Sequence, residues 1–177
     1  LVQRAFERTT DHQQASDQKR LAHWHDQQGS MQQAEVAYLR ALERNHLDEG
    51  LWRDYLQFGL DHQMDRRWWE RTMTKLHNQL LPAHPEPVWA LSKQYIYPEL
   101  FKGMPANKRI AYLGRYLRNV QDWGPVRWNI EPALDWMLKN AGDPREQQQF
   151  LLMTLRNLID SPDLGAPYIA WAMNKLK

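Results

Sequence analysis

The amino-acid sequence predicts an all-α fold, and three observations support this class. β-branched residues are few, and no segment alternates apolar and polar residues with the period of two that marks a strand. Apolar residues instead recur at helical spacing along the 177-residue chain. Prolines and glycines interrupt these stripes at short intervals, which predicts about nine helices joined by short loops. No loop has the composition of a flexible linker, so we expect a single α-helical domain over residues 1–177.

The first three helices are predicted from two apolar stripes and one cap. Residues 16–28 carry the first stripe, which Gly29 and Ser30 interrupt. The second stripe recurs at helical intervals and consists of Met31, Ala34, Tyr38, Ala41 and Leu42. Asp48 is placed to cap a third helix that carries Trp52, because an aspartate side chain accepts hydrogen bonds from the free amides of a first turn.

Proline and glycine divide the second half of the chain. Pro82, Pro85 and Pro87 end one helix and begin another, since proline is accepted in a first turn but not in a helix interior. Further breaks are expected at Pro98, Gly103–Pro105, Gly124–Pro125, Gly142–Pro144 and Ser161–Pro162. The helices between them are expected at 106–121, 130–140, 145–159 and 164–176. Most of the nine tryptophans are expected as wedges in the core between helices.

Residues 101–128 form the most basic region of the chain. They hold six Lys/Arg and one acid, although the net charge of the whole chain is only +2. In the helix expected at 106–121, one face is apolar and predicted to be core: Ile110, Leu113, Leu117 and Val120. Cations and aromatic rings together can bind anionic polymers by charge and stacking. The candidate anion-binding residues are Lys108, Tyr112, Arg115 and Arg118.

The segment from Leu21 to Glu43 resembles part of a tetratricopeptide repeat (TPR), a helix–turn–helix unit whose repeat length is about 34 residues. The positions that carry the likeness are Leu21, Ala22, Gly29, Ala34, Tyr38 and Ala41. Trp52 then stands where this family places the tryptophan of its next first helix. The likeness is clear for residues 15–48 and extends in outline to 82. Residues 83–177 are interpreted as a divergent helical extension.

The register of the second unit follows from counting on by one repeat length. This count places Trp68, Thr72 and Lys75 at the small–aromatic–small positions of the second helix. The resemblance implies antiparallel helix pairs stacked into a superhelical, solenoid-like domain; a compact irregular bundle is the alternative. In this family the first helices line a concave groove. The resemblance therefore implies partner-binding positions at Lys19, His23, Arg53 and Gln57.

The residues that most chemistries need are missing or badly spaced. There is no cysteine, which excludes disulfides, thiolate metal sites and a cysteine nucleophile. All seven histidines precede residue 85, but none has another histidine four residues away, and His23 and His25 point to different sides of a helix. No phosphate-binding loop or nucleophile elbow is present. We therefore expect no catalytic residues, no metal and no cofactor.

Together these observations favour a non-catalytic scaffold that binds a peptide or partner protein through a TPR-like groove, as part of a larger protein or assembly. The alternative is binding of nucleic acid or an acidic glycan by the 101–128 region. A third hypothesis is a purely structural role, as an oligomerisation or regulatory domain.

The compartment is left open by the sequence. No run of about 18 apolar residues exists, so no membrane insertion is expected of these residues. The chain begins at Leu1, which we interpret as the start of a fragment. A soluble protein of the cytoplasm or periplasm and the soluble part of a longer, anchored protein are both compatible with it.

Overall fold

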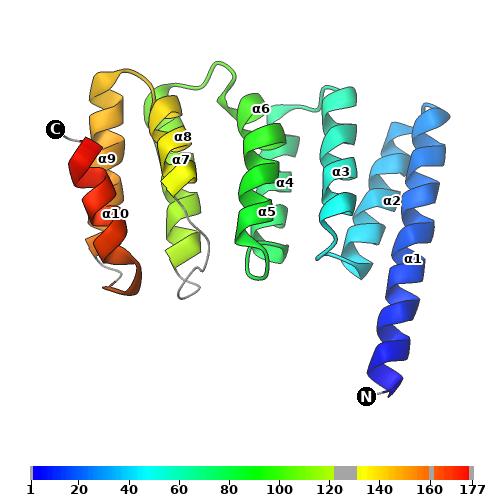
Figure 1. Cartoon of the computed structure of the whole chain (residues 1–177). Helices are drawn as coiled ribbons and strands as arrows, with labels where there is room; N and C mark the ends of the chain where they lie inside the picture. The colour runs from blue at the N-terminus through cyan, green and yellow to red at the C-terminus, as the bar shows by residue number, and fades with distance from the viewer. Residues whose placement is uncertain (1, 122–130, 160–161, 176–177) are drawn as a thin grey trace. The chain divides into compact units, whose positions relative to one another are not determined.

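The computed structural model describes the backbone of residues 2–121, 131–159 and 162–175, and the side chains of residues 10–114, 131–156 and 169–175. Every regular element in these ranges is helical, which confirms the predicted all-α class. The short elements α5, η1 and α6 follow one another without a break. The described residues therefore form nine continuous helical segments, in agreement with the predicted number (Figure 1).

The contacts within the chain divide it into two compact units, Leu1–Glu99 and Leu100–Lys177. This division does not coincide with residue 82, at which the repeat resemblance ends in the sequence. A single domain over residues 1–177 stays a prediction. The two units are described one at a time below.

The first unit is a series of helices joined mostly by short turns. Its elements are α1 (Val2–Gln27), α2 (Met31–Arg44), α3 (Glu49–Asp61), α4 (Arg66–Gln79), α5 (Pro85–Leu91), the π-helical turn η1 (Ser92–Ile96) and the start of α6 (Tyr97–Phe101). Helix α1 begins at Val2, well before the predicted residue 16. The early part of α1 is rich in glutamine, arginine and alanine, which favour helix without producing an apolar stripe. The apolar periodicity of the sequence therefore did not predict the start of α1.

Helices α1 and α2 form an antiparallel hairpin (Figure 1). Asp11, early in α1, contacts Arg44 at the end of α2, while the two helices are joined at their other ends by a short turn. Ala34 and Ala41 have no exposed surface and Tyr38 is 1% exposed. Small side chains allow two helices to approach closely, and the tyrosine ring fills the space beside them. The predicted apolar stripe of α2 is confirmed at these positions.

The turns that end α1 and α3 have the same backbone hydrogen bonds. In each, the amides of three consecutive residues bond back to carbonyls of the last helical turn, and the middle residue has positive φ, which is the Schellman motif. The donors are Gln28, Gly29 and Ser30 in the first turn, and His62, Gln63 and Met64 in the second. Their acceptors are Trp24, Asp26 and His25 in the first turn, and Phe58, Leu60 and Gly59 in the second. Every donor and acceptor of the second turn stands 34 residues after its counterpart in the first.

The second helix pair departs from the predicted register. Asp48 caps α3 as expected, with its side chain accepting from the amide of Leu51 at 3.0 Å. Asp65, which corresponds to Ser30, caps α4, but it stands one position later than the repeat length requires because the second turn is longer. The positions that match Ala34, Tyr38 and Ala41 are therefore Trp69, Met73 and Leu76. All three are buried. Of the expected set, Trp68 and Thr72 are buried too, and only Lys75 is partly exposed, so the later start of α4 and not burial indicates that the count was one position early.

The break expected at Pro98 is also wrong. Helical structure continues from Pro85 to Phe101, and Pro98 lies inside it. A π-helical turn precedes this proline, with the amide of Tyr97 bonded to the carbonyl of Ser92. Such a turn changes the hydrogen-bond pattern locally and lets a helix accommodate an irregularity. Proline composition alone does not reveal it.

The second unit consists of α7 (Ala106–Gln121), α8 (Glu131–Ala141), α9 (Pro144–Ile159) and α10 (Pro162–Lys175). These bounds lie close to those of the predicted helices. Helix α9 contacts the other three. The buried residues of this unit include Ile110, Leu113, Leu134, Met137 and Phe150, whereas the predicted core side chains of Leu117 and Val120 lie outside the described residues.

Five tryptophans are buried, as expected for core wedges: Trp52, Trp68, Trp69, Trp89 and Trp171. Of the other tryptophans whose side chains the structure describes, Trp136 is half-buried and Trp24 is 55% exposed. It lies on α1, where its ring meets the ring of His25 edge-on.

Candidate functional site

The predicted partner-binding residues lie on α1 and α3, which are joined by polar contacts. Lys19 and His23 stand one helical turn apart on α1 and face Asp54 on α3. Lys19 forms an ion pair with Asp54, and the His23 ring nitrogen Nε2 lies 4.0 Å from the same carboxylate. The structure thus brings two of the four predicted residues together around an acidic residue that the sequence did not single out.

Arg53 and Gln57 are the other two predicted residues, and both are exposed on α3. They are separated by about one helical turn, so they share one face of the helix. The Gln57 amide donates to Asp61 Oδ1 at 2.8 Å. Arg53 makes no hydrogen bond or ion pair with any part of the chain that the structure describes. Its guanidinium group is therefore the one predicted cation of this surface that is not already paired.

A second link between the two helices involves residues that sequence reasoning missed. His62, just after α3, lies with Nε2 2.6 Å from Asp26 Oδ1 on α1. The side chains of both residues are 28% exposed, so water reaches them only in part. A bond this short between a ring N–H and a carboxylate is typical of a charge-assisted contact. Spacing within one helix gives no signal for a contact between residues this far apart in sequence.

Tyr38 of α2 lies beneath these polar residues. Burial, and then the negative charges of Asp54, Asp26 and Asp61, raise the pKa of its hydroxyl well above the usual value. The hydroxyl therefore keeps its proton, and it lies within hydrogen-bonding distance of His23 Nδ1, 3.3 Å away. We call these residues the Tyr38 cluster: Lys19, His23, Asp26, Tyr38, Asp54, Asp61 and His62.

Helices α3 and α4 are also hydrogen-bonded to α2, the helix that carries Tyr38. Glu35 Oε1 accepts hydrogen bonds from the Tyr55 hydroxyl at 3.3 Å and from Trp68 Nε1 at 2.7 Å. The Tyr55 ring lies 5.8 Å from that of Tyr38, centroid to centroid. Burial, and then the charge of Glu35, raise the pKa of Tyr55, so that its hydroxyl remains a donor. One carboxylate of α2 thereby connects α2 with α3 and α4.

The acids and histidines of the cluster do not converge on one point. Among the described residues, no group of three or more His, Cys, Asp or Glu side chains is placed to hold a metal ion. The cluster consists instead of pairwise contacts that connect α1 with α3. Within the same residues, no helix is long and apolar enough to cross a membrane.

The second predicted site, in the basic region, is described only in part. Lys108 is exposed at the start of α7, and Tyr112 is half-buried one turn later. The side chains of Arg115 and Arg118 lie outside the described residues. Binding of an anionic polymer here stays a prediction.

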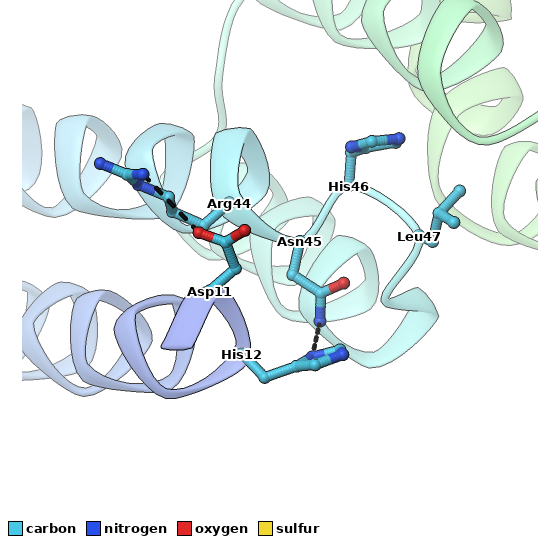
Figure 2. Close-up of a pocket in the computed structure, with 6 residues that line it drawn as sticks. All are labelled: Asp11, His12, Arg44, Asn45, His46 and Leu47. Carbon is cyan, nitrogen blue, oxygen red and sulfur yellow. Dashed lines mark hydrogen bonds and ion pairs between the residues drawn. The ribbon is translucent and has the colours of Figure 1, made fainter. Parts of the chain in front are cut away.

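A pocket of about 350 Å³ lies where α1 passes the loop between α2 and α3 (Figure 2). It is lined by Asp11, His12, Arg44, Asn45, His46 and Leu47. The Asn45 side-chain amide donates from Nδ2 to His12 Nδ1 at 2.9 Å. Arg44 Nη1 lies 3.7 Å from Asp11 Oδ1. The two charges thus neutralise each other. The sequence did not predict this pocket, because it combines residues that are distant in the chain.

Comparisons of the chain with protein-family models, curated proteins and solved structures find no match. The described residues define an all-helical protein, and no known protein narrows this class further. The likeness to a helix-pair repeat is therefore based only on the sequence and the turns of this chain.

Proposed function

We propose that residues 15–82 form two TPR-like helix pairs and that the chain is a non-catalytic scaffold. It binds a peptide or partner protein over the surface formed by α1 and α3. The observation that supports this most directly is the recurrence of the same three turn hydrogen bonds after one repeat length. Repetition of a helix pair at this period is the signature of helical repeat proteins, which present extended surfaces to partners.

The same period relates the four predicted binding residues. Arg53 follows Lys19 by one repeat length, and Gln57 follows His23 by the same interval. Because α1 and α3 end in the same turn, these pairs occupy equivalent positions on two equivalent helices. Successive first helices of a repeat protein present equivalent positions to the same side. This supports a continuous polar surface that runs across α1 and α3.

The chemistry of this surface suits an extended peptide. Arg53 offers guanidinium donors, and Gln57 offers both a donor and an acceptor. Such groups can bond to the carbonyls and amides of a partner backbone. Lys19 and His23 are already held by Asp54, so we expect them to orient a partner, while Arg53 provides most of the affinity.

The test is a double substitution, Arg53→Ala with Gln57→Ala, used as bait beside the wild-type chain in pull-downs from the native source. We expect every partner that uses this surface to bind at least about tenfold more weakly, since losing even one central contact of about 1.4 kcal/mol has that effect. Circular dichroism should show unchanged helix content, because both side chains are exposed.

The matched control removes the same two residue types from α2. Gln33→Ala with Arg40→Ala changes exposed residues that belong neither to the Tyr38 cluster nor to the surface of α1 and α3. We expect this variant to capture the same partners as the wild type. Loss of binding in both variants, or in neither, would count against the proposed surface.

A further inference from the structure

Helix α1 lies at one end of the first unit and carries two exposed apolar side chains on one face (Figure 1). Leu21 is 38% exposed and Trp24 is 55% exposed, and the two stand about one helical turn apart. Tryptophan buries a large apolar area and is enriched at interfaces. A tryptophan left half open beside a leucine is therefore a candidate contact for another molecule.

The positions of α3 that are equivalent to Leu21 and Trp24 are covered by α2. The turns after α1 and α3 match at an interval of 34 residues, so Leu21 corresponds to Tyr55. Trp24 corresponds to Phe58 in the same way. Tyr55 and Phe58 are each 2% exposed. The ring of Tyr38 on α2 lies 5.8 Å from the first and 5.4 Å from the second, centroid to centroid. An aromatic side chain of the preceding helix thus covers on α3 the two positions that are open on α1.

A charged position beside these residues has opposite signs on the two helices. On α3, Asp54 forms an ion pair with Lys19 of α1. The residue equivalent to Asp54 on α1 is Arg20, whose side chain is 75% exposed. Where α1 offers a cation to α3, a molecule that covers α1 in the same way must therefore offer an acid to Arg20.

A second copy of the chain does not meet this requirement. If the first helix pair of a second copy stacked on α1 as the chain's own pair stacks on α3, the Lys19 of that copy would lie beside Arg20. Like charges in contact oppose association. Symmetric packing of two α1 helices is also unfavourable, because α1 has only two large exposed apolar residues among its described side chains. A stable interface buries about 20 to 30 residues on each side.

We propose that Arg20, Leu21 and Trp24, which we call the Trp24 face, bind an amphipathic helix of a protein partner. The partner places an aromatic ring against Leu21 and Trp24, as Tyr38 does on α3, and an acidic residue beside Arg20. The inference uses the same interval of 34 residues as the proposed function. It concerns a different face of α1, however, because Lys19 is turned toward α3, so the two proposals can fail separately.

The test titrates a labelled peptide of residues 30–45, held helical by a covalent staple, onto the full chain and follows fluorescence anisotropy. This α2 sequence is the probe because α2 covers the equivalent positions of α3. We expect Trp24→Ala to weaken binding at least about tenfold, and Leu21→Ala to weaken it in the same direction. Leu47→Ala is the matched control, since Leu47 is 43% exposed in the loop after α2 and should leave binding unchanged.

A second peptide tests the charge. It carries Arg40→Glu and Arg44→Glu, and we expect it to bind the wild-type chain about threefold more tightly than the first peptide. Arg20→Glu in the chain should abolish this advantage. The chain with Arg53→Ala and Gln57→Ala should bind both peptides as the wild type does, which separates the Trp24 face from the surface proposed for α1 and α3.

Absence of saturable binding of either peptide would overturn the proposal, and so would equal binding by the wild type and Trp24→Ala. An acidic peptide without any advantage would exclude the contact with Arg20. Sedimentation velocity tests the other occupant: self-association of the wild type that Trp24→Ala removes would mean that a second copy covers the Trp24 face and not a partner helix. Circular dichroism should show unchanged helix content in the variants, because the substituted side chains are exposed.

Discussion

The two helix pairs of the first unit have the same type of turn but different side chains packed between their helices. The pairs α1–α2 and α3–α4 are connected by the same Schellman hydrogen bonds. Between α1 and α2 the small residues Ala34 and Ala41 are fully buried. The equivalent residues of α4 are Trp69 and Leu76, which are as deeply buried. The turn thus specifies an antiparallel hairpin, while the side chains between the helices determine how closely they approach.

Small residues allow close approach at both interfaces. In the first pair, small residues of both helices provide the space: Ala22 of α1, and Ala34 and Ala41 of α2. In the second, Gly59 of α3 does so, since a Cβ at this position would lie 2.4 Å from the ring of Trp68 on α4. The residue equivalent to Gly59 in α1 is His25, so the second pair has a small residue at a position where the first pair has a large one.

The largest effect is expected where the second pair depends on a bulky side chain. Trp69→Ala removes a ring that is 1% exposed and leaves a cavity that its neighbours cannot fill, so we expect the free energy of unfolding to fall by about 3–5 kcal/mol. Trp24→Ala is the control, because Trp24 is 55% exposed and should cost about 0.5 kcal/mol or less. Urea unfolding measures both. Equal losses would mean that Trp69 does not hold the pair together.

An intermediate effect is expected where the first pair depends on a small side chain. Ala34→Leu inserts a bulkier side chain between helices in close contact, and we expect it to lower the free energy of unfolding by about 1–3 kcal/mol. Val36→Leu introduces the same residue on the exposed side of the same helix and should change stability by less than about 0.5 kcal/mol. Thermal unfolding distinguishes them. If Ala34→Leu were neutral, close approach of α1 and α2 would not be required.

The first helix pair could be predicted from the sequence because its signals are local. The alanines and Tyr38 stand at helical spacing, Gly29 marks the turn, and Asp48 marks the next helix. The register of α4 could not be predicted so well. Its turn is longer by one position, and Gln63 rather than glycine has the positive φ, so the usual sign of a helix end is missing.

The candidate site was predictable only one helix at a time. Helical spacing placed Lys19 with His23 and Arg53 with Gln57, and the structure has each pair on one face. The ion pair with Asp54 and the bond between Asp26 and His62 depend on how α1 lies against α3. Two helices can meet in several registers that bury similar apolar area, so composition does not decide which polar residues face each other.

The smallest effect is expected in the turns, where the same backbone conformation is occupied by two different residues. Gly29 has φ +70° and Gln63 has φ +49°, a region that costs a residue with a side chain about 1 kcal/mol or more. Gly29→Ala should therefore lower the free energy of unfolding by about 1 kcal/mol. A Cβ at Gly29 would meet nothing within 4 Å, so the loss reflects backbone conformation alone.

Gln63→Gly should act in the opposite direction. It relieves the strain at the second turn, and part of the gain is offset by the larger conformational freedom of glycine in the unfolded chain. We therefore expect an increase in stability below about 1 kcal/mol, measured by urea unfolding beside Gly29→Ala. Gln28→Gly, one position before the left-handed residue, controls for the entropy of glycine and should destabilise. Opposite signs at Gly29 and Gln63 would establish that both turns depend on one backbone geometry, and equal signs would show that the second turn is held by its side chains instead.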